Sequence, residues 1–465
     1  MKYFLTGWLV CAISFAMAQT SQPNVIIIFT DDQGYQDLGS YGSPNISTPN
    51  LDRMAKEGIR CTDFYVTASV CSPSRASLLT GRYPNRSSVG SVFFPDQQGM
   101  DSEQVTIAEI LKEAGYVTAC FGKWHLGDSQ ENLPLNQGFD EYFGIPYSND
   151  MYIGSKQSFA QNVVFREGYS LEKAKADQRF VLENKKDRQK IKEKGLRGLC
   201  PLFEGNEIVE YPCEQTTLTE RYFDRAMDFI GKQGPKPFFV YLTPAMPHVP
   251  LYASEKFEGR SIGGLYGDAV EEIDWNVGRL MQYLTDNRLD ENTIVIFTSD
   301  NGPWLGYKDQ AGHAAPLRDG KFTNYEGGVR VPCIMHWNRK WDADKSVGTI
   351  LSTVDLLPTI AYYAGVELPK GQTDGINMAR HLENTAHPLA RNQVLYTKGK
   401  HVVGIRIGDW KLLPQSGARH SDETSKPELF NLKEDISESN NLYDKHPEIV
   451  RQLTIELEKF SETVK

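Results

Sequence analysis

The residues best suited to chemistry form one unbroken string that starts at Cys71 and reads Cys-Ser-Pro-Ser-Arg-Ala-Ser-Leu-Leu-Thr-Gly-Arg. The string predicts a short helix with Ser72 as its cap, Pro73 in its first turn and Gly81 at its end. Cys71 then lies at the positive end of the helix, where an anion is favoured, and Arg75 can reach back toward it. A lone buried cysteine is usually an inert core thiol, so the prediction of a reactive residue depends on the whole string.

Hard oxygen ligands follow two apolar segments that have the composition of buried strands. They are Asp31 and Asp32 after residues 25–29, and Asp300 and Asn301 after residues 293–297. Either pair alone would be an ordinary turn sequence. Together, after two matching strands, they favour a cation site, and calcium prefers such carboxylate and amide oxygens whereas zinc prefers nitrogen and sulfur.

Two more apolar segments end in polar residues of a catalytic type. Residues 117–121 precede Lys123 and His125, and residues 238–242 precede His248. Continuous apolar strands separated by helical segments predict an α/β fold with a mostly parallel sheet covered on both faces. Ligands of such sheets bind beyond the carboxyl ends of the strands, so we expect all four strand ends to supply one site.

These motifs together resemble the type I sulfatases, and most closely the arylsulfatase A and N-acetylgalactosamine-6-sulfatase type. The string from Cys71 matches the family signature C-x-P-S-R followed by L-T-G-R. The resemblance covers nearly the whole chain and is weakest around residues 155–197. Further matching segments are Thr30–Gly34, Gly122–Gly127, Gly144–Asp150, Pro247–Pro250, Ser299–Gly302, Leu317–Lys321 and Tyr325–Pro332.

The resemblance implies a fold, two cofactors and a set of roles. The fold is a large mixed, mostly parallel sheet sandwiched by helices, as in alkaline phosphatase, with a small C-terminal α+β domain that carries an antiparallel sheet. Cys71 would be oxidised by a maturase to formylglycine (3-oxoalanine), whose hydrate is the nucleophile. Asp31, Asp32, Asp300 and Asn301 would hold Ca²⁺ together with residue 71.

The resemblance also implies the remaining catalytic roles. The chemistry of a sulfate ester, which carries one negative charge and has an alkoxide as its leaving group, supports them. Arg75 and Lys123 would neutralise the hydrate and the sulfate, and Lys321 would bind the sulfate or its bridging oxygen. His248 would protonate the leaving sugar oxygen, and His125 would accept a proton when sulfate is expelled. Either histidine alone would more often be structural.

The substrate is expected to be a sulfated glycan, held in a pocket shaped for a single sugar at a chain end. The residues expected to bind it are Ser148, Asn149, Asp150, Trp304, His313 and Arg318. The segment from Ser170 to Arg197 is dense in charged residues, which favours a solvated helical insertion; the alternative is a lid over the substrate.

Composition and cysteines bound the remaining properties. The 465 residues are 40% hydrophobic with a formal net charge of −10, which is typical of a globular protein and excludes a nucleic-acid footprint. Residues 1–18 resemble a secretion signal cleaved after Ala18. The sequence has no second apolar span, so we expect no stable membrane anchor. Secretion or a periplasmic location would allow a disulfide between Cys200 and Cys213.

The expected domains are the signal at 1–18, a catalytic domain at 19–365 and a small domain at 366–465.

Two other functions stay open at this point. A phosphonate or phosphate ester hydrolase of the same superfamily could use a similar site, although Lys123, His125, His248 and Lys321 match the sulfatase set. An inactive glycan-binding protein would result if Cys71 were not oxidised.

Overall fold

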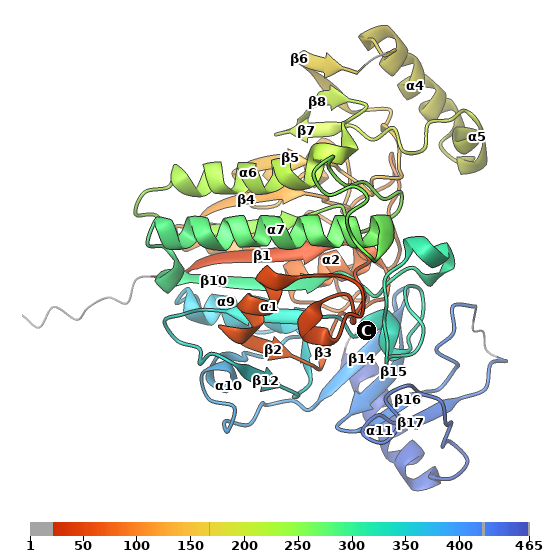
Figure 1. Cartoon of the computed structure of the whole chain (residues 1–465). Helices are drawn as coiled ribbons and strands as arrows, with labels where there is room; N and C mark the ends of the chain where they lie inside the picture. The colour runs from red at the N-terminus through yellow and green to blue at the C-terminus, as the bar shows by residue number, and fades with distance from the viewer. Residues whose placement is uncertain (1–21, 167, 421–423, 464–465) are drawn as a thin grey trace, which may run out of the picture.

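The computed structural model describes residues 22–166, 168–420 and 424–463, so the predicted signal at residues 1–18 lies outside the described residues. An 11-stranded mixed sheet forms the centre of the molecule, with helices on both faces (Figure 1). In spatial order its strands are β12 (Lys345–Val347), β2 (Ile59–Cys61), β11 (Cys333–His336), β10 (Thr293–Ser299), β1 (Asn24–Thr30), β9 (Phe238–Thr243), β4 (Val117–Gly122), β5 (Glu141–Gly144), β7 (Leu202–Glu204), β8 (Glu207–Tyr211) and β6 (Ser158–Phe165). Strands β10, β1, β9, β4 and β5 are parallel neighbours, which confirms the predicted mostly parallel sheet.

Strand β1 shows how a continuous apolar run builds two cores. Successive side chains of a strand point to opposite faces, so Val25, Ile27 and Phe29 pack in one core. Ile26 and Ile28 pack in the other, and all five side chains are fully buried.

Helices cover both of these cores. The face of Ile26 is covered by α1 (Pro49–Lys56), α6 (Leu218–Gly231) and α7 (Gly264–Asp286). The opposite face is covered by α2 (Cys71–Thr80), α3 (Ile107–Glu113) and α9 (Leu356–Tyr363). The central strands are therefore buried on both sides, and the candidate site residues Asp31 and Asp300 follow directly after the ends of β1 and β10.

A second, four-stranded antiparallel sheet follows in the C-terminal part, as predicted. Its strands are β14 (Gln393–Lys398), β15 (His401–Ile407), β16 (Trp410–Leu413) and β17 (Glu428–Asn431). Helix α11 (Pro447–Thr463) packs on it through Leu453 and Leu457. The two tight turns that precede His401 and Trp410 contain Gly399 and Gly408, both at positive φ, a conformation that glycine adopts without strain.

Buried charges join this sheet to the larger one. Lys411 Nζ lies 2.9 Å from Glu326 Oε1 and 2.8 Å from Glu438 Oε1, and all three side chains are fully or nearly fully buried. Arg406 Nη1 lies 2.7 Å from Asp63 Oδ1 in the same region. Because removal of one partner would leave an uncompensated buried charge, this cluster fixes how the two sheets pack.

The charged insertion is partly anchored rather than wholly solvated. It contains α4 (Leu171–Asn184) and α5 (Arg188–Glu193), which lie to the right of the edge strands β6, β8 and β7 in Figure 1. Val181 and Ile191 are fully buried and pack with Tyr152 and Leu196 in a small separate core. The prediction of a solvated appendage is therefore wrong for the buried side of these helices.

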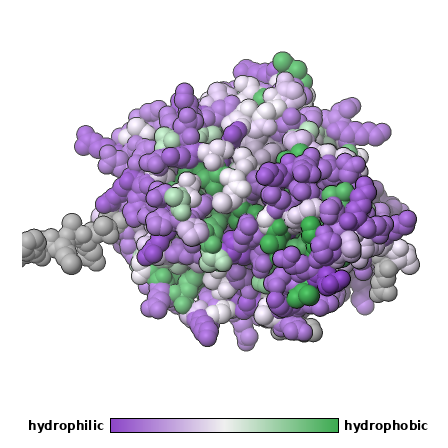
Figure 2. Space-filling model, turned by 90° about the horizontal axis from the view of Figure 1, so that it is seen from below, coloured by the Kyte–Doolittle hydropathy of each residue, from purple (hydrophilic) through white to green (hydrophobic). Residues whose placement is uncertain are grey.

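Cys200 and Cys213 lie side by side, with their sulfur atoms 3.2 Å apart and both as free thiols. Their proximity supports the predicted disulfide, which stays a prediction. Hydrophilic side chains cover most of the face seen in Figure 2, with apolar residues in small separate groups. Over the described part of the chain, none of the helices has the length and hydropathy needed to span a bilayer.

Candidate active site

A cavity of about 700 Å³ lies at the carboxyl ends of the central strands and has Cys71, His125, His248 and Lys321 among its lining residues. The loops that follow β1, β4, β9 and β10 meet at this edge of the sheet, because parallel strands end on the same side. A larger hollow of about 980 Å³ lies at the opposite edge, but the described residues that line it include no cysteine, histidine or acidic residue. The chemistry is therefore concentrated in the smaller cavity.

Helix α2 holds Cys71 at its first position. Val70, in an extended conformation, is the N-cap, and Gly81 ends the helix at φ +65°. Our prediction of Ser72 as the cap is wrong: Ser72 lies inside the helix, and its hydroxyl accepts a hydrogen bond from Phe93 N at 3.1 Å. Burial raises the pKa of the Cys71 thiol to about 12, so the unmodified side chain is protonated at neutral pH.

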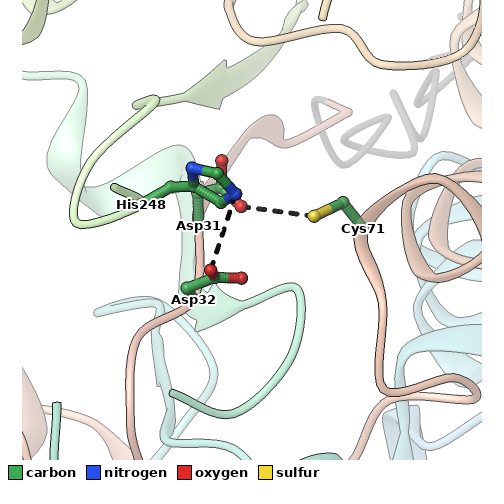
Figure 3. A group of neighbouring side chains, drawn as sticks. All are labelled: Asp31, Asp32, Cys71 and His248. Carbon is green, nitrogen blue, oxygen red and sulfur yellow. Dashed lines mark hydrogen bonds and ion pairs between the residues drawn. The ribbon is translucent and has the colours of Figure 1, made fainter. Parts of the chain in front are cut away.

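The predicted oxygen ligands surround Cys71. Its Sγ atom lies 3.6 Å from Asp31 Oδ1 and 3.5 Å from Lys321 Nζ. Ligand atoms of Asp31, Asp32, Cys71 and His248 all lie within 4.8 Å of one another (Figure 3). The structure thus brings the end of β1 and the start of α2 to one point, 40 residues apart in the chain.

Asp300 and Asn301 complete this group from the end of β10. Asp32 N donates to Asp300 Oδ1 at 3.1 Å, and Asn301 Nδ2 donates to Asp32 Oδ1 at 2.7 Å. The other amide atom, Asn301 Oδ1, is buried and accepts no hydrogen bond from any described residue. A buried oxygen without a partner costs free energy, and a bound cation would satisfy it.

Three buried cations balance the three carboxylates. Arg75 donates through Nε to Asp300 Oδ2 at 3.0 Å and through Nη1 to the carbonyl oxygen of Lys123 at 3.1 Å. Lys123 pairs with Asp31, and Lys321 Nζ lies 2.6 Å from Asp32 Oδ1. Burial opposes ionisation, but the positive charges of Lys123, Arg75 and Lys321 outweigh it and lower the pKa of Asp31 well below its usual range.

Both predicted catalytic histidines are buried at this cavity. His125 Nε2 lies 3.1 Å from the carbonyl oxygen of Phe93, and its Nδ1 has no partner among the described residues. His248 Nδ1 lies 2.5 Å from its neighbour's carbonyl oxygen, and its Nε2 lies 3.7 Å from Asp32 Oδ2. Burial and Lys321 lower the pKa of His248 to about 4, and burial and Lys123 lower that of His125, so both rings are neutral here.

The expected glycan-binding residues divide into two groups. Ser148, Asp150 and Trp304 line the cavity, and the Trp304 ring lies 5.9 Å from the His248 ring. Three others are absent from the lining because they have other partners. They are Asn149, which donates to Gln215 Oε1 at 2.9 Å, His313, whose Nδ1 lies 3.3 Å from Asp37 Oδ1, and Arg318, which donates to Glu438 O at 2.8 Å.

Sequence reasoning missed a second part of the lining. Aromatic rings of Phe94, Tyr152 and Phe322 face the cavity, and the insertion adds Arg188, Gln189, Lys192 and Arg197. The four-residue spacing of Arg188 and Lys192 in an acidic chain was the available signal. Phe94, Tyr152 and Phe322 lie in loops without a periodic pattern, so the sequence contains no signal that would place them at the cavity.

Comparisons with known proteins agree with this arrangement. A family model described as Sulfatase matches residues 23–366, and one described as N-sulphoglucosamine sulphohydrolase, C-terminal, matches residues 318–463. Human arylsulfatase A is 36% identical over 459 residues, with 93% of this chain and 86% of the relative covered. Dog N-acetylgalactosamine-6-sulfatase is 35% identical over 433 residues, with 87% and 75% covered.

Two solved structures are similar over most of their length. The PsFucS1 sulfatase from Pseudoalteromonas sp. has a TM-score of 0.79 at 28% identity, with 95% of this chain and 90% of the other covered. The complex of Ps i-CgsB with k-i-k-neocarrahexaose has a TM-score of 0.74 at 30% identity, with 95% and 93% covered. A phosphonate monoester hydrolase of Agrobacterium radiobacter, at 18% identity and a TM-score of 0.64, shares the fold.

Proposed function

The chain belongs to the sulfatase family and is a sulfuric ester hydrolase, and from this premise we propose that it cleaves sulfated glycans with a formylglycine formed at Cys71 and with calcium as its metal. The observation that carries the proposal is the position of Cys71, which lies within hydrogen-bonding reach of both Asp31 and Lys321 at the bottom of the cavity. The predicted signal at residues 1–18 supports export, which would bring the enzyme to extracellular or periplasmic glycans.

The residues at the strand ends fit calcium. Asp31, Asp32, Asp300 and Asn301 offer hard oxygen atoms, and Asn301 Oδ1 is buried without another partner among the described residues. Three carboxylates and three cations already cancel in this buried cluster. A divalent ion would therefore add a charge that the sulfate ester and the developing charge on the nucleophile would balance.

When bound, calcium would supply a Lewis acid and the aldehyde hydrate an oxygen nucleophile, which together make attack on sulfur feasible at neutral pH. The chain's own residues then handle charge. Arg75 and Lys123 would hold the nucleophile and its ligands in place, and Lys321, at the cavity surface, would bind a sulfate oxygen.

Two histidines would move the protons. His248, beside Lys321 in the lining, would be protonated once an anionic sulfate ester lies in the cavity, because a nearby negative charge raises the pKa of the ring. It would then donate this proton to the sugar oxygen that leaves sulfur. His125, whose Nδ1 is free of partners among the described residues, would accept the proton released when sulfate departs from residue 71. Their positions in one cavity on separate loops suit an acid and a base that act at different steps.

The cavity favours a sugar at a chain end over the middle of a polymer. The insertion contributes Arg188, Lys192 and Arg197 to the lining, to which the aromatic residues Trp304 and Phe322 also belong. We expect sulfate release to scale with the number of chain ends, because a cavity of about 700 Å³ lined in part by the insertion suits one terminal sugar better than a continuous chain. The measurement is initial sulfate release from one sulfated polysaccharide before and after partial depolymerisation at constant total sulfate.

A variant that lacks residues 170–197 provides a comparison, with its fold checked by thermal melting. Its dependence on chain ends should be weaker than that of the wild type. Release from intact polymer as fast as from its fragments, by wild-type enzyme, would contradict action at chain ends.

A further inference from the structure

A second positively charged group lies on the wall of the cavity, away from the buried cluster at its bottom. Arg188 and Lys192 of α5 line the cavity that also exposes Cys71 and Lys321. Their four-residue spacing places them on one side of the helix. Arg197 pairs with Asp150, but neither Arg188 nor Lys192 forms an ion pair with a described residue.

These two cations are held on a fixed element. Ile191, between them in the sequence, is fully buried in the small core with Val181 and Leu196. The same core contains Tyr152, which also lines the cavity, so the helix is packed directly against the pocket wall. The Arg188 guanidinium lies 3.9 Å from the centre of the Phe94 ring, a cation–π contact that orients it.

Uncompensated cations at this place are unexpected in a chain with a net charge of −10, whose overall field repels anionic glycans. The reactive sulfate does not need them, because Arg75, Lys123 and Lys321 already lie near Cys71. We propose that Arg188 and Lys192 bind a second anionic group, a sulfate or a carboxylate, on the sugar next to the one whose sulfate ester is cleaved. The inference rests on the proposed function and narrows its substrates to glycans with anionic groups on adjacent sugars.

The test uses the full-length matured enzyme and three variants, Arg188→Ala, Lys192→Ala and the double variant. Lys190→Ala is the matched control, because Lys190 is on the same helix, pairs with Asp187 and does not line the cavity. The probes are disaccharides of carrageenan, chondroitin and heparan type that all carry one sulfate ester on the first sugar. The neighbouring sugar carries a second sulfate or a carboxylate in the two-anion forms and a hydroxyl in the one-anion form. The quantity measured is the ratio of kcat/KM for the two-anion form to that for the one-anion form, with an aryl sulfate as a probe of turnover.

We expect the wild type and Lys190→Ala to prefer a two-anion form about tenfold in at least one backbone, and the double variant to lose this preference. The preference should fall as salt is raised, because both cations are exposed. A larger effect of the sulfate arm or of the carboxylate arm identifies which anion is bound.

A kcat/KM ratio near one for the wild type in every backbone would overturn the proposal, and so would an unchanged ratio in the double variant. If the enzyme still hydrolyses the aryl sulfate in that case, the proposed function stands. If wild type releases no sulfate from any probe, the proposed function itself fails, and this inference fails with it.

Discussion

Replacement of Cys71 by alanine is expected to abolish sulfate release while the protein stays folded. The side chain is the only source of the proposed nucleophile, and loss of a nucleophile lowers kcat on the order of 10⁶-fold in a hydrolase that acts by covalent catalysis. The cost in stability should be only about 1 kcal/mol, since one buried sulfur atom is removed. Sulfate release and thermal melting measured on the same preparation check both expectations.

Cys61→Ala is the matched control. Cys61 is also fully buried, but it lies on β2 opposite Cys333 and does not line the cavity. This variant should show a similar change in stability and retain activity. Appreciable sulfate release by Cys71→Ala would rule out residue 71 as the nucleophile.

Removal of divalent metal should eliminate activity and lower the melting temperature, and calcium should restore both better than zinc. Several kcal/mol of transition-state stabilisation depend on such an ion, which corresponds to roughly 10³-fold in rate. Stability has an independent link to the metal, because calcium at about 100 times its Kd adds ~2.7 kcal/mol to the folded state. The measurements are activity and melting in chelator, then with each metal added.

Asn301→Ala sharpens this test. The variant removes the Oδ1 atom, which has no described hydrogen-bond partner, and also the Nδ2 bonds to Asp32 and Gly302, so it should cost roughly 1–3 kcal/mol without metal. It should in addition weaken calcium binding by about tenfold or more. Asn276→Ala is the control, because that asparagine is equally buried but lies in α7, away from the site. Its Nδ2 donates to Glu272 O, and its Oδ1 accepts from Arg279, both in the same helix. Full activity in chelator, or equal calcium dependence of melting in both variants, would refute a calcium site at Asn301.

Much of the site's framework could be predicted because it depends on strong local patterns. Apolar strands that end in Asp31, His125 or Asp300 must be central strands of a parallel sheet, and that topology alone brings their ends together. Gly81 could likewise be predicted to end helix α2, since few other residues tolerate its positive φ. These features need no knowledge of distant contacts.

The outer part of the pocket could not be predicted because it depends on packing between distant segments. Asn149 looked like a binding residue, but its side chain donates to Gln215 and to the carbonyl oxygen of Pro250. His313 is likewise held by Asp37. The charged insertion gave the opposite surprise: Ile191 anchors a helix whose polar side forms part of the cavity wall. Composition reports how much charge a segment has, not which side of it is buried.

If the reacting group is an aldehyde made from Cys71, the fraction of Cys71 that has been converted should set the rate of sulfate release. Preparations made with and without a formylglycine-generating maturase are digested with trypsin, and mass spectrometry gives the fraction of peptide 61–75 in which the CH2SH group has become CHO. Sulfate release is measured on the same preparations. We expect a rate proportional to the converted fraction and no release without conversion. Full release from enzyme whose Cys71 is entirely unconverted would show that the reacting group is not this aldehyde.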